Sequence, residues 1–572
     1  MRLVLAAPSL SNVYLLPIAV GLALTAQAAP TPFAASDAGT TYGGPVAGAD
    51  WGRPLACGDL DGDGFEEVLV AASQSYGGFL SRVYVLRGGP RAHGRGEVDL
   101  STTPPDQVIL GAELDDNLGS SVAAGDVNGD GVDDLLVCAS TADYAGIEDR
   151  GIAYLIYGGS GFFTAAVRDL ADPNQWSLRI LGPVAGGDMG GSNLFGGLDA
   201  QAAGIGRLNN DVYGDIALGV HLATGGGSAS GRVYVIFGGP IAPGWTLNLA
   251  VSGQYNVRIN GRAAYDELGT VVLTGDLTGD GLDELILPNQ YASRGLLTSE
   301  GAVHIFRGRA TWANTYNLAS TPADVTLWGA RRQDELGASA AVGDFNGDGR
   351  TDLAVGAPGA DAGALNTQRG DGFVYGLLGS PAYQTGMFTI DYATATPDFL
   401  LVGEGEENLG TLVSAGDFNG DGVSDIAAAE WFGGPETNGV VEVLFGRSFA
   451  AGETYTANVD TDLHIVGAAN DRISFSLGAA DTNGDGLNEI LFGTPFNNED
   501  RGTVYVFTYV SGDADLDGDR DVADFAIWQA CVMGPPQRGL SPPCVRFDFN
   551  LDENIDGADL AAFAARLGGP GP

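Results

Sequence analysis

A short acidic motif recurs along this 572-residue chain and constrains its fold more than any other feature. In "DFNGDGRTD", from Asp344 to Asp352, oxygen-bearing side chains stand at positions 1, 3, 5 and 9, and a glycine stands at position 6. The complete copies start at Asp59, Asp126, Asp276, Asp344, Asp417 and Asp481, and a degraded copy, "RLNNDVYGD", starts at Arg207. The starts lie about 64 to 81 residues apart. Such a period predicts a repetitive architecture.

Each copy of the motif stands in the same setting, which predicts four antiparallel β-strands per repeat. A small apolar run precedes the motif and a run rich in β-branched residues or Leu follows it, as in "LLVCAS" from Leu135. An alternating strand such as "GRVYVIFGG" comes next, and a fourth short strand completes the unit. Seven such units predict an all-β fold, a seven-bladed β-propeller of four-stranded antiparallel blades. The alternative, a right-handed solenoid, would not need a four-strand unit.

The two ends of the repeat region predict how the ring closes. The last unit shows no obvious fourth strand after Val510, and the first unit is preceded by spare residues, "FAASDAGTTYGGPVAG". We expect this N-terminal stretch to supply the outer strand of the last blade. The propeller is therefore assigned to residues 29–510.

The motif has the chemistry of a loop that wraps a hard cation. Carboxylate and amide oxygens at alternate positions, with a glycine for the sharp turn, suit Ca²⁺, which takes six to eight flexible oxygen ligands. Mg²⁺ demands a stricter octahedron, and Zn²⁺ would call for His or Cys, which these loops lack. The alternative is a turn that is rich in Asp, Asn and Gly for conformational reasons alone. The predicted propeller ligands are Asp59, Asp61, Asp63, Glu67, Asp126, Asn128, Asp130, Asp134, Asp276, Thr278, Asp280, Glu284, Asp344, Asn346, Asp348, Asp352, Asp417, Asn419, Asp421, Asp425, Asp481, Asn483, Asp485 and Glu489.

The degraded copy is expected to hold no cation. Arg207 replaces its first ligand, and an arginine side chain stays charged, so its guanidinium can stand in for the metal. We therefore expect about six propeller sites.

These repeats resemble the FG-GAP repeats of the integrin alpha-subunit propeller. "VGAP" (355–358) and "GTPF" (493–496) match the GAP half of that motif, and "NLG", "LFG" and "ELG" stand at the FG position. The resemblance implies a ring of seven repeats in which calcium binds on one face and ligands bind on the opposite face. Six intact loops exceed the four that such propellers carry, and secreted bacterial proteins with similar repeats are a nearer match.

The C-terminal residues 511–572 carry two further loops with EF-hand spacing, each followed by an amphipathic helical pattern. They resemble a type I dockerin, a paired calcium-binding module, which implies a cohesin-type partner and two more Ca²⁺ sites. The alternative is a calcium-stabilised cap without a partner. The predicted ligands are Asp513, Asp515, Asp517, Asp524, Asp548, Asn550, Asp552 and Asp559. Cys531 and Cys544 flank a Pro-rich loop and are expected to form a disulfide, whereas Cys57 and Cys138 are expected to be buried free thiols.

Composition limits the compartment and the partners. Residues 1–28 read as a cleaved signal peptide, which predicts a secreted or cell-surface protein without a membrane span. Acidic residues outnumber basic ones 72 to 27, and the net charge is -45. A chain without a basic surface is not expected to bind nucleic acid.

The sequence favours adhesion or scaffolding, through protein or glycan contacts, over catalysis. None of the four histidines shares a motif with a nucleophile, and we expect no enzyme. The alternatives are a carbohydrate-active or phospholipase-D-like accessory protein and a purely structural surface-layer component. Aromatic and Arg side chains are enriched at binding hot spots. The candidate ligand-binding residues, in loops expected opposite the calcium loops, are Tyr76, Tyr144, Tyr291, Arg331, Arg332, Trp431, Phe432 and Phe496.

Overall fold

The fold is seen in a computed structural model of the full chain. The described residues are 33–35, 38–45, 51–72, 78–89, 96–191, 201–295, 298–361, 370–405, 407–434, 438–468, 472–495 and 501–509. The predicted signal peptide, the predicted dockerin-like module with its eight ligands, the predicted Cys531–Cys544 disulfide, Tyr76 and Phe496 lie outside these residues.

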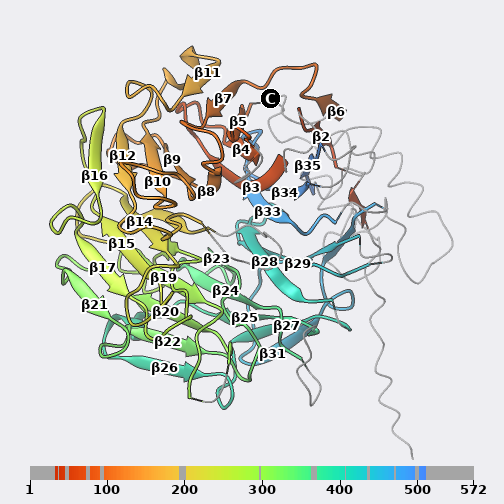
Figure 1. The fold of residues 1–572 in the computed structure, drawn as a ribbon. Coiled ribbons are helices and arrows are strands. Elements are labelled where there is room, and N and C mark those ends of the chain that lie inside the picture. Colours follow the sequence, from red (N-terminus) through yellow and green to blue (C-terminus); the bar gives the residue numbers. More distant parts are fainter. Residues whose placement is uncertain are drawn as a thin grey trace, which may run out of the picture.

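Seven twisted sheets are arranged as a ring, which confirms the predicted seven-bladed β-propeller (Figure 1). Within each sheet, four consecutive strands pair antiparallel from the centre outwards. The seventh blade contains three of its four strands in sequence and takes the fourth from the N-terminal end. The strands, from the inner to the outer edge of blades one to seven, are β3 (Trp51–Gly58), β4 (Glu67–Ala72), β5 (Arg82–Leu86), β7 (Gln107–Leu110); β8 (Leu118–Gly125), β9 (Asp134–Ala139), β10 (Ile152–Ile156), β12 (Leu178–Leu181); β13 (Ala203–Gly206), β14 (Asp215–Val220), β15 (Arg232–Ile236), β17 (Val257–Asn260); β18 (Leu273–Gly275), β19 (Glu284–Asn289), β20 (Ala302–Phe306), β22 (Val325–Trp328); β23 (Ala340–Gly343), β24 (Asp352–Ala357), β25 (Phe373–Leu377), β27 (Phe399–Val402); β28 (Leu409–Gly416), β29 (Asp425–Glu430), β30 (Val440–Leu444), β32 (Leu463–Val466); and β33 (Ser476–Ala480), β34 (Glu489–Thr494), β35 (Thr503–Phe507), β2 (Thr40–Gly43).

Every sheet has a fifth strand, which corrects the expectation of four-stranded blades. In six blades this strand comes from the connection between the third and fourth strands of the following blade, and in blade six it is β1 from the N-terminal segment. In every case it pairs parallel to the outer strand. It is too short to give a clear alternating pattern in the sequence. The fifth strands of blades one to seven are β11 (Val167–Asp169), β16 (Trp245–Asn248), β21 (Thr315–Asn317), β26 (Phe388–Asp391), β31 (Glu453–Thr456), β1 (Phe33–Ala34) and β6 (Gly96–Asp99).

The ring closes through the N-terminal residues, as the sequence analysis expects. β2 pairs antiparallel with β35, and Thr40 stands opposite Val506. β1, just before it, pairs parallel with β32 of the sixth blade. Figure 1 shows β2 and β35, from opposite ends of the colour scale, side by side. Closure by strand pairing leaves no exposed sheet edge between the first and last blades.

Most of the core of the described residues lies in seven large apolar clusters, each between two neighbouring blades. The second strand of each blade is buried along all six of its residues because a neighbouring blade covers each of its faces. The described chain contains two 3-10 turns, η2 (Phe162–Thr164) and η4 (Pro381–Gln384). No helix in that part of the chain is long and apolar enough to cross a membrane.

Candidate functional site

Each acidic motif forms the hairpin between the first and second strands of its blade, so all seven lie on the same face of the ring. The aspartate at position 1 holds the hairpin through its own backbone. In the first loop Asp59 Oδ1 accepts from the N–H groups of Gly62 (2.8 Å) and Asp63 (3.1 Å), and Asp59 Oδ2 accepts from Gly64 (3.0 Å). Asp126, Asp276 and Asp481 repeat all three bonds. The carboxylate therefore fixes the turn as well as offering oxygen to a cation.

Two glycines give these hairpins a backbone that other residues rarely adopt. Positions 4 and 6 have positive φ in all six complete loops, for example 78° at Gly62 and 90° at Gly64. Residues with a Cβ atom are strained in that region, so Gly is favoured at both places. The turn curls tightly enough to aim alternate side chains inwards.

The acid at position 9 is the first residue of the buried second strand. Burial raises the pKa of Asp134 to about 7 and that of Asp425 to about 8. Their carboxylates also tie the hairpin to the blade: Asp425 accepts from the N–H of Phe418 in the loop and from that of Gly446 after β30, both at 2.8 Å. Taking a carboxylate out of water disfavours its charged form, and a bound cation would reverse that preference.

The first loop shows most directly that these residues fit a cation. Oxygen atoms of Asp59, Asp61 and Glu67 lie within 4.8 Å of one another. Glu67 is fully buried, and its Oε1 has no hydrogen-bond partner. Burial, together with the nearby carboxylates, raises the pKa of Glu67 to about 8. Arg87, after β5, pairs with Asp61 and Asp63 from outside the loop, which partly neutralises them.

The third hairpin has a different construction. The Arg207 guanidinium donates to the backbone carbonyl of Asp211 at 3.0 and 3.2 Å, so it crosses the loop without pairing with the loop's carboxylates. Asn210 and Val212 occupy the two glycine positions, and neither has positive φ. Asp215 is still buried and bonded to Leu208 and Gly238. The hairpin retains its structural bonds but has lost the first ligand and the two left-handed glycines.

The seven hairpins are joined to one another in a closed ring of backbone hydrogen bonds. In each, the N–H at position 8 donates to the carbonyl oxygen at position 1 of the preceding blade's hairpin, at 2.8 to 3.2 Å. The seven donors are Glu66, Asp133, Gly214, Asp283, Thr351, Ser424 and Asn488, and the bond from Glu66 to Asp481 joins the first blade to the last. Ordering one hairpin therefore also orders a contact between blades.

On the opposite face, the six described candidates for ligand binding occupy three separate places. Tyr144, in the β9–β10 loop, is 37% exposed and stacks on Arg179, with the guanidinium carbon 4.5 Å from the ring centroid. Tyr291 is half-buried in the β19–β20 loop, and the exposed Arg331 and Arg332 lie in the β22–β23 loop. Arg332 donates to Thr298 of the β19–β20 loop at 2.9 Å, which links these two loops.

Trp431 and Phe432 form the third place, in the β29–β30 loop. Their half-buried rings stack with centroids 5.2 Å apart, and Trp431 also meets Phe475 edge-on. The sequence analysis did not identify the buried Phe475 or two exposed side chains on this face, Leu114 (60%) and Tyr265 (68%). Leu114 and Tyr265 stand just before the "DNLG" and "DELG" segments. Their position before the FG part of the motif could have identified them from the sequence as residues of this face.

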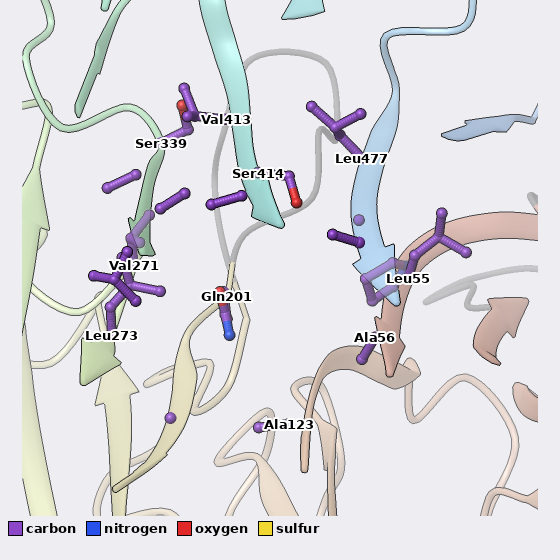
Figure 2. A pocket seen from close by; sticks show the side chains of 18 of the residues that line it. Leu55, Ala56, Ala123, Gln201, Val271, Leu273, Ser339, Val413, Ser414 and Leu477 are labelled. Atoms are coloured by element: carbon purple, nitrogen blue, oxygen red, sulfur yellow. The ribbon is translucent and has the colours of Figure 1, made fainter. Parts of the chain in front are cut away.

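The inner strands enclose a cavity of about 340 Å³ along the ring axis (Figure 2). Small and apolar residues line most of it, including Ala56, Ala123, Val271 and Leu477, and the polar lining residues include Gln201, Thr274, Ser339 and Ser414. Cys57 on β3 is half-buried and contributes to this lining, and Cys138 on β9 is buried; both thiols are free. The described lining residues include no acid and no base, so this cavity has little chemistry of its own.

Comparison with known proteins agrees with this geometry. Residues 268–306, 336–377 and 475–507 match the FG-GAP repeat family, and residues 59–137 match the FG-GAP-like repeat family. The chain thus contains FG-GAP repeats in a seven-bladed propeller.

Two curated relatives share part of this region. Integrin alpha-V of Gallus gallus is 31% identical over 194 residues, which cover 32% of this chain and 16% of that protein. Phosphatidylinositol-glycan-specific phospholipase D of Homo sapiens is 31% identical over 189 residues, covering 32% of this chain and 21% of that protein. The alignments therefore span about a sixth and a fifth of these relatives.

Among solved structures, the rhamnogalacturonan lyase YesW aligns with 80% of this chain and 72% of its own, at 13% identity and a TM-score of 0.33. A score this low supports no functional argument.

Proposed function

We propose that this protein is an extracellular FG-GAP propeller that binds Ca²⁺ in six hairpins and acts as an adhesion or scaffold module. Its protein or glycan ligand would be bound by the loops opposite the hairpins. The observation that carries this proposal is the contrast between two faces: seven hairpins joined into one ring on one side, and loops of varied length and composition with exposed aromatic and Arg side chains on the other.

The role of calcium in this proposal is structural. Position 1, 3, 5 and 9 side chains would hold the ion, with the carbonyl at position 7 completing the shell. The bound charge would allow acids such as Asp134 and Glu67 to ionise in their buried sites. The proposal assigns no catalytic step to the propeller.

Secretion and the C-terminal module belong to the same proposal. A cleaved signal peptide would bring the chain to a compartment where Ca²⁺ is abundant. The dockerin-like residues 511–572 would attach the propeller to a cohesin-type partner, and binding of the full chain to immobilised cohesin domains, with and without EGTA, tests that attachment.

The ligand-face assignment is tested by removing aromatic side chains from it. Trp431→Ala and Tyr291→Ala are expected to reduce retention of exoproteome proteins or arrayed glycans at least tenfold while leaving the melting temperature within about 1 °C, because half-buried loop residues contribute little to the core. Val212→Ala, an exposed change on the hairpin face, is the matched control. Equal retention by all variants would contradict the assignment.

A further inference from the structure

Blade six differs from the other blades at two facing positions in its interior. The third residue of the third strand is aromatic in the other six blades: Tyr84, Tyr154, Tyr234, His304, Tyr375 and Tyr505. In β30 this residue is Glu442, which is fully buried. The last residue of β29 is Glu430, 2% exposed, where β4, β9 and β24 end in Ala. One blade has therefore gained two buried acids.

The strand register places both acids on the face of the sheet that packs against blade five. Ala428 stands opposite Glu442, and Glu430 lies two residues further along the same strand, so its side chain points to the same face. Ala428 belongs to the apolar cluster that includes Phe399 and Leu401 of blade five. The acids therefore lie between two blades, and Glu430 stands at the opposite end of β29 from the hairpin acid Asp425.

Glu442 is held in a fixed orientation. Its Oε2 accepts a hydrogen bond from the Thr461 hydroxyl at 2.6 Å, and its Oε1 lies 2.5 Å from Nδ1 of His464. His464 stands directly opposite Glu442 on β32. A carboxylate pinned in this way is pre-oriented, as ligands are by the groups around a metal site.

Glu430 is incompletely satisfied. Its side chain lies close to that of Glu407, which is in the connection from blade five. Its Oε1 is buried without a hydrogen-bond partner. Burial, with Glu442 and Glu407 nearby, raises the pKa of Glu430 to about 10. Burial and the neighbouring acids therefore favour the protonated form of Glu430.

Two other buried acids have an arginine partner. Glu300, whose side chain is fully buried, pairs with Arg294 at 2.9 Å, and Asp462 pairs with Arg447. Within the described chain no arginine pairs with Glu407, Glu430 or Glu442. The charged or titratable groups around them are Glu404 and His464, so this pocket has a deficit of positive charge.

We propose that Glu407, Glu430 and Glu442 bind a hard divalent cation of the Ca²⁺ or Mn²⁺ class between blades five and six, separately from the hairpins. Carboxylate oxygens are the preferred ligands of such ions. His464 and Thr461 position Glu442. When the cation binds, Glu430 releases its proton to solvent, and the cation balances the negative charge of the resulting carboxylate. In the described chain the ligand oxygens of these three acids do not all lie within 4.8 Å of one another, so Glu407 and Glu430 turn towards the fixed Glu442 in this step.

The test uses the full chain with Mn²⁺ as the probe. Glu430→Gln keeps the shape of the side chain but cannot supply a carboxylate, and it is expected to bind one Mn²⁺ fewer than the parent chain in equilibrium dialysis. Asp417→Ala, in the hairpin of the same blade, is the control and is expected to lose a different ion. In protein labelled with ¹⁵N-histidine, Mn²⁺ should broaden the His464 imidazole signals in the Asp417→Ala variant but not in Glu430→Gln.

A second variant guards against misfolding. Glu430→Ala combined with Glu442→Tyr copies the pattern of blade two, where Ala139 and Tyr154 occupy these positions, and it should fold and also bind one ion fewer. The inference is overturned if Glu430→Gln binds as many ions as the parent chain, or if the His464 broadening persists in Glu430→Gln and disappears in Asp417→Ala. Either result would leave the hairpin sites of the proposed function untouched.

Discussion

The two faces of this propeller are built on different principles. On the hairpin face, seven loops repeat one pattern, and a hydrogen bond from each position 8 to the preceding position 1 joins all of them. On the opposite face, the loops differ in length and composition, and their aromatic and Arg side chains form separate groups around Tyr144, Tyr291 and Trp431. The comparison teaches that one face maintains the ring, and that this leaves the other face free to vary.

The largest expected effect comes from removing calcium from the hairpin face. With Kd values of about 10⁻⁴ to 10⁻³ M, each filled site contributes about 1.4 to 2.7 kcal/mol at about 10 mM Ca²⁺. Six sites should raise the melting temperature by roughly 8 to 16 °C over that in EGTA, given the unfolding entropy of a chain of this size. Calorimetry in the two buffers measures the difference. Equal melting temperatures would remove the distinction between a structural face and a binding face.

A change of pH is expected to have an intermediate effect on the melting temperature, and the direction of that effect depends on whether calcium is bound. Without calcium the position 9 acids have raised pKa values, about 7 for Asp134 and about 8 for Glu67, so the native state binds more protons than the unfolded state between roughly pH 4 and 8. In EGTA the protein should therefore be most stable near the acidic end of this range. Its melting temperature should fall by several degrees as the pH rises from 5 to 8.

With calcium present, the same acids are held ionised by the cation, and protons compete with binding. The stabilisation by calcium should then grow as the pH rises from 5 to 8. Melting curves across this range in both buffers provide the check. A calcium effect that shrinks with rising pH would show that the buried acids do not interact with the ion.

The smallest expected effect concerns the third hairpin. The single variant Arg207→Asp should bind no ion at this hairpin, because Asn210 and Val212 do not have the left-handed backbone of the complete loops. The triple variant Arg207→Asp, Asn210→Gly and Val212→Gly should gain one Ca²⁺ in equilibrium dialysis and melt about 1 to 3 °C higher in about 10 mM Ca²⁺. If the single variant binds an ion as well as the triple one, the glycines are not what the site requires.

Much of the fold was predictable because the repeated motif fixes the number of blades and the place of each hairpin. The missing fourth strand after Val510 also predicted the closure that β2 makes with β35. The fifth strands, such as β11 and β21, were missed because strands of three residues carry no usable alternation, and their pairing partner belongs to another blade.

The candidate sites also differ in how much of each could be predicted from the sequence. Position and chemistry of the hairpin acids can be read from the motif, since every ligand lies within nine residues of the first. The aromatic candidates could be assigned to a face by topology, but their grouping depends on which loops touch. The cluster around Glu430 had no local signal, because Glu407, Glu442 and His464 come from different segments.

The sequence by itself determined the repeat, the hairpin chemistry and the face on which the acids gather, because these depend on spacing within one turn and on strand direction. Only the tertiary structure decided that the position 9 acids lose contact with water, that neighbouring hairpins share hydrogen bonds, and that two glutamates meet inside blade six. Each of these depends on a surface supplied by another blade, and short-range periodicity does not encode which blade covers which residue.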